Sequence, residues 1–347
     1  MVQIDHVHFY VDQAQIWRDW FVHRLGFQCQ SSRRTPDSEQ EVLDNGQLRL
    51  HLSAPRRPNS PIAQFLQKHP PGVADIALRV QNLAEICAHP RVTVLTPPHP
   101  SSAGELTAQI AAWGSLRHTL IQGGEREARR FPRKGPVGGI DHSVLNVPYG
   151  DLQAAVEWYC DILGFTPQQQ FTIATARSSL HSQVLVHPDS GVQLPINEPT
   201  SPNSQIQEFL DHNRGAGIQH IALSTPDILY WVPQLRQLGL SFLKVPGTYY
   251  DGLRRKPGFC LKEPEWRRLV EAEILVDWND ATYPALLLQT FTKPIFKEPT
   301  FFFELIERRS VNVQGELMTA QGFGEGNFQA LFEAVEQQQL QRRKPQP

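Results

Sequence analysis

The chain repeats itself, and this duplication constrains its fold more strongly than any single motif. Ile4-Asp5-His6 precedes an aromatic-rich helical pattern that ends at Leu25-Gly26-Phe27. Ile140-Asp141-His142 precedes a similar pattern that ends at Leu163-Gly164-Phe165. In each copy, alternating strand residues give way to a helix closed by glycine, and another strand pattern follows. The repeat predicts two related structural units.

The match continues further along both copies. Ile62-Ala63-Gln64-Phe65-Leu66 precedes a strand pattern at residues 72–78, and Ile206-Gln207-Glu208-Phe209-Leu210 precedes one at residues 217–223. We therefore predict a duplicated α+β fold in which each half has a curved, mainly antiparallel sheet. Alternate residues of a partly closed sheet point inward, so ligands from distant strands can converge in its cavity.

The stretch 123–139 carries glycine, proline and charge and is the predicted linker between the halves. We divide the chain into modules of residues 1–125 and 126–347. Two domains are also what a length of 347 residues favours.

The composition excludes several classes of protein. Hydrophobic residues make up 40% and charged residues 20% of the chain, which is typical of a globular protein. The formal net charge of -2 gives no electrostatic basis for binding nucleic acid. The first residues resemble no secretory signal, and no apolar run approaches the roughly 20 residues of a membrane helix. The four cysteines form no CxxC pair, so we expect reduced thiols in a cytoplasmic protein.

The duplication identifies two histidines that differ from isolated ones. His142 is equivalent to His6, and His220 is equivalent to Asp75, so only the second half keeps histidine at both positions. A single histidine in a strand is more often structural than a metal ligand. Two at matched strand positions favour a metal site.

Glu304 is the candidate carboxylate ligand. It lies in a strand pattern, residues 300–308, with apolar residues on both sides. Buried glutamate needs a partner, which is either a divalent cation or one of the arginines Arg308 and Arg309. We read Glu307, which has the opposite strand parity, as an exposed ion pair with Arg308. Two imidazoles and one carboxylate are typical of Fe(II) oxygenases, although zinc accepts similar ligands.

Around these residues the chain resembles the 4-hydroxyphenylpyruvate dioxygenases of the vicinal-oxygen-chelate superfamily. The resemblance spans nearly the whole chain and is strongest in the second half. The segments that carry it occur in the family's order: GGIDH (138–142), LPINEP (194–199), SQIQ (204–207), GAGIQHIA (215–222), LQTFTKP (288–294), FFELIER (302–308) and GFGEGNF (322–328).

The resemblance implies βαβββ modules that form two half-open barrels, of which the N-terminal one is non-catalytic. It implies one Fe(II) per chain on His142, His220 and Glu304. It also implies conversion of 4-hydroxyphenylpyruvate and O2 to homogentisate and CO2, with electrons supplied by decarboxylation of the substrate itself. The residues that match the polar side of the family's pocket are Ser182, Asn197, Gln205, Gln219 and Gln289. Those that match its apolar side are Phe291, Phe302, Phe328 and Leu331.

Strand alternation agrees with one of these assignments. If Glu304 faces the metal, Phe302 faces the same side, whereas Phe301 and Phe303 face the other.

The last segment is the predicted lid. Phe328, Leu331, Phe332 and Val335 have helical spacing and form one apolar face. A helix closing over the metal would exclude water, and a permanently packed helix fits the pattern equally well. Asn327 is the predicted N-cap. The candidate hinge residues are Gly322, Gly324, Gly326 and Asn327.

Four alternatives remain open from sequence. His6, Asp75 and His118 form a possible second ligand set in the first half. Hydroxymandelate synthase uses the same substrate and ligands but hydroxylates the side chain. Extradiol catechol cleavage occurs on a similar duplicated fold, although Pro195-Ile196-Asn197 does not resemble that group. A metal-binding or aromatic-acid-binding protein without catalysis is the non-enzyme alternative.

The resemblance further implies a homodimer or homotetramer. The partners expected are the small-molecule substrate and O2, with no nucleic acid and no membrane. Tyrosine catabolism and supply of homogentisate for plastoquinone or tocopherol both fit such an enzyme.

Overall fold

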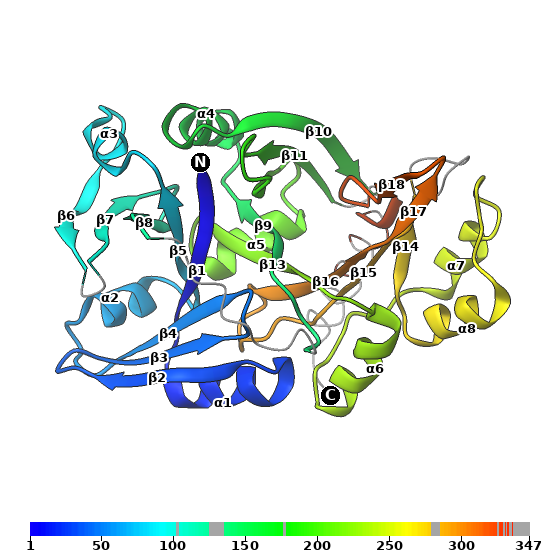
Figure 1. Ribbon diagram of the computed structural model, residues 1–347, viewed down its shortest axis with the longest axis horizontal. Coiled ribbons are helices and arrows are strands. Elements are labelled where there is room, and N and C mark those ends of the chain that lie inside the picture. Colours follow the sequence, from blue (N-terminus) through cyan, green and yellow to red (C-terminus); the bar gives the residue numbers. More distant parts are fainter. Residues whose placement is uncertain are drawn as a thin grey trace.

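The computed structural model describes residues 1–101, 104–124, 135–175, 178–278, 285–324, 326–328, 330, 332 and 335. The first half contains one eight-stranded sheet with the strand order β2-β3-β4-β1-β5-β8-β7-β6 (Figure 1). Its elements are β1 (Val2–Tyr10), α1 (Ala14–Leu25), β2 (Gln28–Arg34), β3 (Ser38–Asp44), β4 (Arg49–Pro55), α2 (Pro61–Lys68), β5 (Gly72–Val80), α3 (Leu83–Ala88), β6 (Val94–Pro100), β7 (Leu106–Ala111) and β8 (Arg117–Gln122).

The second half contains another eight-stranded sheet, with the order β10-β11-β12-β9-β13-β16-β15-β14, and a two-stranded sheet of β17 and β18. Its elements are β9 (Ile140–Asn146), α4 (Leu152–Leu163), β10 (Thr166–Ala174), β11 (Ser179–Val186), β12 (Gln193–Pro199), α5 (Gln205–Asn213), β13 (Gly217–Ser224), α6 (Ile228–Gln237), α7 (Gly247–Leu253), α8 (Glu263–Glu271), β14 (Leu275–Asp277), β15 (Leu287–Phe291), β16 (Phe302–Arg308), β17 (Ser310–Val313) and β18 (Glu316–Thr319).

The two strand orders correspond position by position, which confirms the predicted duplicated α+β fold. Each sheet is itself two βαβββ units, because β1-α1-β2-β3-β4 is followed by β5-α3-β6-β7-β8, and the second half repeats this order with extra helices after β13. The units meet at antiparallel pairs, β1 with β5 and β9 with β13. The two large sheets therefore consist of four such units, whereas the sequence repeat reveals only two.

Glycine ends the first helix of each half, as the repeat predicted. Gly26 after α1 has φ 74° and Gly164 after α4 has φ 70°. The backbone N–H of Gly26 donates to the carbonyl of Phe21, and that of Gly164 to the carbonyl of Cys160. Glycine adopts this left-handed conformation at little cost, so each helix stops here and the next strand begins.

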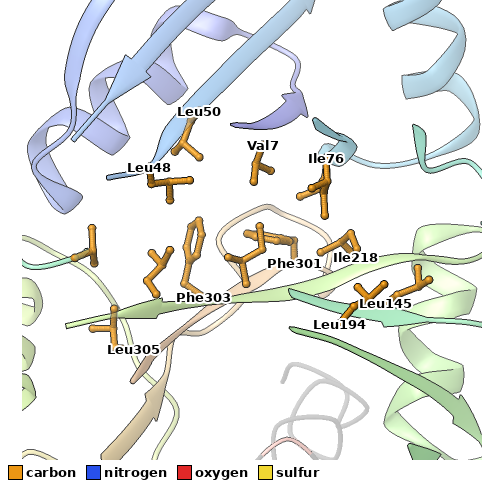
Figure 2. Packing of buried hydrophobic residues seen from close by; sticks show 14 of the residues in the cluster. Val7, Leu48, Leu50, Ile76, Leu145, Leu194, Ile218, Phe301, Phe303 and Leu305 are labelled. Carbon is orange, nitrogen blue, oxygen red and sulfur yellow. The ribbon is translucent and has the colours of Figure 1, made fainter. Parts of the chain in front are cut away.

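The main hydrophobic core lies between the two large sheets. Figure 2 shows Val7 and Ile76 of the first sheet opposite Phe301 and Phe303 of the second. Phe301 packs edge-on against Phe9 at a ring-centroid distance of 5.1 Å. Because strand residues alternate between faces, Glu304 and its neighbours of the same parity lie on the face of β16 turned away from this core.

Among the described helices, none has both the length and the apolar composition needed to cross a membrane. All four cysteines carry free thiols. Residues 125–134 of the predicted linker lie outside the described residues, and the boundary near residue 125 stays a prediction.

Candidate metal centre and adjoining cavity

Three buried side chains from three strands converge at one point. His142 of β9, His220 of β13 and Glu304 of β16 each offer a ligand atom, and these atoms lie within 4.8 Å of one another. Glu304 Oε2 is 3.3 Å from His142 Nε2 and 3.7 Å from His220 Nε2. The exposed fractions of the three residues are 2%, 5% and 1%. The geometry thus brings together the three predicted ligands.

The sheet topology explains this convergence. β13 lies between β9 and β16, and Ala222 of β13 is the register partner of both His142 and Glu304. His220 lies two residues earlier on the same strand and shares its face with Ala222. Since alanine is small, the side chains on either side can approach one another across the central strand.

A β-bulge precedes each of the two histidines. The register of β9 on β13 skips Asp141, and that of β13 on β9 skips Gln219. A bulge re-aims side chains, so neighbouring residues that would otherwise face opposite sides can meet. Asp141 Oδ1 lies 2.9 Å from His142 Nδ1, and Gln219 Oε1 lies 3.4 Å from His220 Nδ1.

These contacts favour the same tautomer in both rings. When a ring is neutral and its Nδ1–H donates to the preceding side chain, the Nε2 lone pair is directed toward Glu304 Oε2. Neutral imidazoles with a free Nε2 are the form that binds a divalent cation.

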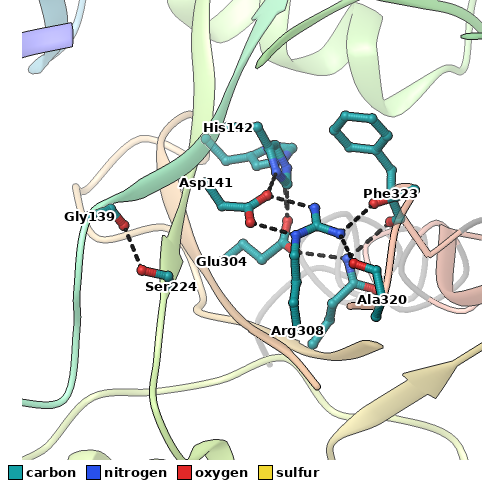
Figure 3. Close-up of polar contacts among 11 residues, drawn as sticks. Gly139, Asp141, His142, Ser224, Glu304, Arg308, Ala320 and Phe323 are labelled. Carbon is teal, nitrogen blue, oxygen red and sulfur yellow. Dashed lines mark hydrogen bonds and ion pairs between the residues drawn. The ribbon is translucent and has the colours of Figure 1, made fainter. Parts of the chain in front are cut away.

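Gln289 orients the carboxylate. Its Nε2 donates to Glu304 Oε1 at 2.8 Å and to the carbonyl of Phe323 at 3.0 Å, while its Oε1 accepts from Asn327 Nδ2 at 2.7 Å. Oε2 of Glu304 is left facing the two imidazoles. Glu304 is therefore held by an amide and two histidines. The expected alternative, an arginine partner, is wrong because Arg308 pairs with Asp141 instead (Figure 3).

The reading of Glu307 as an exposed partner of Arg308 is also wrong. Glu307 pairs with Arg309 at 2.7 Å and accepts a hydrogen bond from the backbone N–H of Ile228 at 2.7 Å. It therefore stabilises the start of α6.

The electrostatics of the centre favour a cation. Burial opposes protonation of His142, but the carboxylates of Glu304 and Asp141 outweigh it and raise the pKa of His142 to about 9. Burial and the nearby His142 hold the pKa of His220 well below its usual range. Burial tends to raise the pKa of Asp141, but hydrogen bonds from Arg308 and His142 hold it well below its ordinary value. A proton on His142 can interact with only some of the three ligand atoms. A divalent cation would satisfy all three, so the residues fit a metal.

A cavity adjoins His142 and His220, and most of the predicted substrate residues line it. The predicted residues that line it are Ser182, Asn197, Gln205, Gln219, Phe302 and Phe328. Phe302 stacks on His220 with 4.8 Å between ring centroids, which is the face that strand alternation predicted. Gln289 and Phe291 lie behind this wall, the former against Glu304 and the latter against Phe302. Leu331 lies outside the described residues.

The sequence reasoning missed several apolar residues of the wall. Those not predicted as substrate residues are Val144, Phe171, Ile173, Leu180, Pro195, Ile206, Phe323 and Phe332. The ring of Phe323 packs against that of His142 with 5.1 Å between the centroids, and the rings of Phe171 and Phe328 are separated by the same centroid distance of 5.1 Å. Phe171 and Ile173 share strand parity in β10, so alternation alone could have placed both on one face.

The cavity contains an unsatisfied polar group. Ser182 is 1% exposed, and its hydroxyl has no hydrogen-bond partner. Buried polar atoms are rarely left unpaired, because an unmade hydrogen bond costs about 1–3 kcal/mol. A ligand in the cavity would supply the missing partner.

The C-terminal segment covers the cavity. Residues 326–328, 330, 332 and 335 are helical, and Phe328 and Phe332 line the wall. Gly322 and Gly324 have φ of 80° and 72°, whereas Gly326 has no positive φ and donates its N–H to Asp277 Oδ2 at 2.8 Å.

Asn327 is not the N-cap that we predicted, because the helix already includes residue 326. The amide of Asn327 instead makes tertiary contacts. Its Oδ1 accepts from the Tyr249 hydroxyl at 2.7 Å, and its Nδ2 donates to Gln289. Asn327 thus connects the first turn of the helix to Gln289 of β15 and Tyr249 of α7.

The first half has no comparable centre among the described residues. Asp75 accepts hydrogen bonds from the hydroxyl and the backbone N–H of Thr119 at 2.6 and 3.0 Å. His118 faces the core, with Nδ1 against the carbonyl of Ile76 at 2.8 Å and Nε2 against the Tyr159 hydroxyl at 3.2 Å. The possible second ligand set is therefore excluded, because His118 lies on the opposite face of the sheet from His6.

Comparisons with known proteins place these features in a family. Residues 139–261 match the Glyoxalase/Bleomycin resistance protein/Dioxygenase superfamily. The chain is 37% identical to an uncharacterized protein of Synechocystis sp., over 99% of this chain and 100% of that protein. It is 34% identical to 4-hydroxyphenylpyruvate dioxygenase of Yarrowia lipolytica, over 97% of this chain and 92% of that protein. A mutant of 4-hydroxymandelate synthase from Streptomyces coelicolor has a similar structure, with a TM-score of 0.84 and 25% identity over 97% of this chain and 98% of that one.

Proposed function

The chain belongs to the 4-hydroxyphenylpyruvate dioxygenase family, and we propose that it uses Fe(II) on His142, His220 and Glu304 to convert 4-hydroxyphenylpyruvate and O2 to homogentisate and CO2. The observation that carries the proposal is the convergence of two Nε2 atoms and one carboxylate oxygen beside a cavity lined mainly by apolar residues. Three protein ligands on one side of a metal leave the other side for substrate and O2.

Iron, when bound, would activate O2 and accept the electrons that decarboxylation of the 2-oxo acid releases. The chain's own residues supply binding and orientation. Asp141 and Gln219 hold the two imidazoles in the tautomer that presents Nε2. Gln289 directs Oε2 of Glu304 to the same point. Asp141, Gln219 and Gln289 therefore orient the proposed metal ligands and do not act on the reacting atoms of the substrate.

Neutral polar groups suit the substrate wall. Ser182, Asn197 and Gln205 present hydroxyl and amide groups that both donate and accept, so they can bind a phenol or an oxo acid without adding a competing charge. Phe302 and Phe328 provide apolar surface for an aromatic ring. The helix that carries Phe328 and Phe332 would exclude water from the reacting atoms.

Iron rather than zinc is part of the proposal. Two histidines and one carboxylate accept either ion, but only a redox-active metal fits a dioxygenase. The proposal also includes a cytoplasmic enzyme, in line with four free thiols, an assembly of two or four identical chains, and modules divided near residue 125.

Hydroxymandelate synthase chemistry is the second candidate, favoured by the structural similarity to that enzyme. The chain is 25% identical to the synthase and 34% identical to the dioxygenase of Yarrowia lipolytica. Side-chain and ring hydroxylation differ in which carbon of the bound substrate lies next to the activated oxygen.

Chromatography of the product separates the candidates. Metal-free protein is loaded with Fe(II) or with Zn(II) and incubated with 4-hydroxyphenylpyruvate in air. We expect homogentisate from the Fe(II) sample and no product from the Zn(II) sample. Hydroxymandelate would identify the synthase, and substrate binding without turnover in the Fe(II) sample would identify a binding protein.

A further inference from the structure

Arg308 contacts two parts of the second half that are distant in sequence. Its Nε donates to Asp141 Oδ2 at 2.7 Å, and its Nη2 donates to Asp141 Oδ1 at 2.7 Å. Its Nη1 donates to the carbonyl oxygens of Gly322 at 2.8 Å and Ala320 at 3.2 Å. One guanidinium therefore joins the carboxylate that contacts His142 to the backbone immediately before the lid helix (Figure 3).

We propose that Arg308 is a positioning residue that couples the orientation of His142 to closure of the segment 320–328. This inference rests on the proposed function, because it takes His142 as a metal ligand. The planar guanidinium is suited to the task, since its fork matches both oxygens of a carboxylate while a third nitrogen remains free for carbonyl groups. A lysine ammonium has no fork and cannot make all four contacts in this geometry.

The burial of the pair makes these contacts specific. The side chains of Arg308 and Asp141 are 17% and 10% exposed, so water competes only weakly for their donors and acceptors. Asp141 Oδ1 accepts from both Nη2 of Arg308 and Nδ1 of His142. A shift of the guanidinium therefore changes the hydrogen bond that sets the imidazole.

A related arrangement in the first half serves as an internal control. Asp5 Oδ1 lies 2.7 Å from His6 Nδ1, and Arg79 Nε donates to Asp5 Oδ2 at 2.7 Å. The remaining donors of Arg79 contact the carbonyl oxygens of Gly123 and Gly124 and the carboxylate of Glu105. An Asp–His–Arg arrangement is thus common to both halves, and contact with the lid is specific to Arg308.

A second link acts in parallel. Gln289 connects Glu304 to the carbonyl of Phe323 and to Asn327. Two of the three proposed ligands are thus tied to the lid segment. Coupling between two sites is reciprocal, so a metal that orders the ligands also stabilises the closed segment, and a closed segment strengthens metal binding.

The test measures metal affinity and lid order separately. Arg308→Lys and Arg308→Gln are compared with two controls, Arg79→Lys and Arg309→Lys. Co(II) replaces iron, because its visible absorption reports coordination by histidine and carboxylate. Hydrogen exchange of residues 320–328 is measured with and without Co(II).

We expect Arg308→Lys to weaken Co(II) binding by roughly 10–100-fold, as loss of a partner behind a ligand does in other metal sites. Exchange in 320–328 should become faster, and its slowing by Co(II) should become smaller than in the wild type, with the remainder carried by Gln289. Both controls should bind Co(II) within about twofold of the wild type, since neither side chain contacts the segment 320–328 or a proposed ligand. Arg309 meets that segment only through its backbone carbonyl, which accepts from the N–H of Ala320 and is retained in the variant.

If both Arg308 variants show faster exchange in 320–328 but unchanged Co(II) affinity, the coupling is overturned. Arg308 would then only stabilise the position of this segment. If the variants do not fold, the wild type still provides a test, because the coupling is overturned if Co(II) slows exchange in 320–328 no more than in the first sheet. Wild-type protein that gives no Co(II) spectrum of this kind would instead refute the proposed function itself.

Discussion

Thr119 occupies in the first sheet the position that Glu304 occupies in the second. Asp75 pairs with Arg117 across β5 and β8, which puts Thr119 opposite Ala77, the register partner of His6. Glu304 lies opposite Ala222, the register partner of His142, in the same way. At the positions of His220 and Glu304 in the second half, the first half thus has Asp75 and Thr119, which are hydrogen-bonded to each other. Among the residues that the structure describes, the duplicated fold therefore has one candidate metal site.

The first prediction concerns metal stoichiometry. We expect one Fe(II) per chain in the wild type, because only the second half combines two histidines with a carboxylate among the described residues. Glu304→Ala should lower metal affinity by more than about 100-fold, beyond the loss typical of a residue behind a ligand, while the protein stays folded. Metal analysis and circular dichroism measure the two effects. Two metals per wild-type chain, or full occupancy in the variant, would contradict this assignment.

The second prediction concerns Gly324, one of the predicted hinge residues. Gly324 and Gly315 both have positive φ, so alanine at either site should cost about 1 kcal/mol of backbone strain. A Cβ on Gly324 would also collide with Gln289 Oε1, whereas one on Gly315 meets nothing within 4 Å. We expect Gly324→Ala to lower kcat at least about tenfold by displacing Gln289 from Glu304.

Gly315→Ala is the matched control for that experiment. It should lower the unfolding midpoint slightly and leave kcat unchanged. Equal effects of the two substitutions on kcat would show that backbone strain, and not the contact with Gln289, decides the outcome.

The third prediction concerns the unpaired hydroxyl of Ser182. Ser182→Ala should weaken binding of 4-hydroxyphenylpyruvate to the metal-loaded protein without O2 by roughly 3–10-fold, the cost of one hydrogen bond. Its stability should not fall, because the hydroxyl has no partner in the folded protein. Thr225→Val removes another buried, unpaired hydroxyl that lies outside the cavity wall, so substrate affinity should not change. A Ser182 variant with wild-type affinity would remove this residue from the substrate site.

The fourth prediction concerns acid stability. Burial lowers the pKa of His8 to about 4, although Asp75 acts in the opposite direction, and burial together with His6 lowers that of His51 to about 2. An unfolded histidine titrates near 6.5, so below that pH the unfolded chain binds more protons. Stability should therefore fall as the pH decreases from about 6.5 toward 4, by on the order of 2 kcal/mol for each of these two histidines.

Urea unfolding of the wild type and of His51→Gln, measured at several pH values, checks this slope. The variant should lose less stability on acidification than the wild type. His99→Gln, at an exposed position, is the control. An identical pH dependence of all three proteins would mean that His51 is not held neutral in the folded protein.

The sequence predicted the fold class and the residues of the candidate centre because both leave strong local signals. Glycine at the helix ends, the repeated Ile-Asp-His and strand alternation around Phe302 are read directly from neighbouring residues. The second level of duplication was not visible, since units such as β1–β4 and β5–β8 share topology but little recognisable sequence. Topology can persist after sequence similarity is lost, because many side chains satisfy the same alternation.

The contacts behind the ligands could not be predicted, for a different reason. Simple alternation directs Asp141 and His142 to opposite faces, and only the bulge in β9 brings them together. A bulge depends on the pairing of two strands distant in sequence. The same limit explains His118, which was considered as a ligand because its strand corresponds to that of Glu304. The equivalent position is that of the next residue, Thr119, and a shift of one residue reverses the face.

The most direct test of the central claim uses 18O2. Fe(II)-loaded protein is given 4-hydroxyphenylpyruvate under labelled oxygen, and the product is analysed by mass spectrometry. Homogentisate should carry two labelled oxygen atoms, one in the new ring hydroxyl and one in the carboxylate formed as CO2 leaves. The Glu304→Ala variant should form no homogentisate. Labelled hydroxymandelate, or homogentisate without label, would contradict the proposal that His142, His220 and Glu304 hold iron for this dioxygenation.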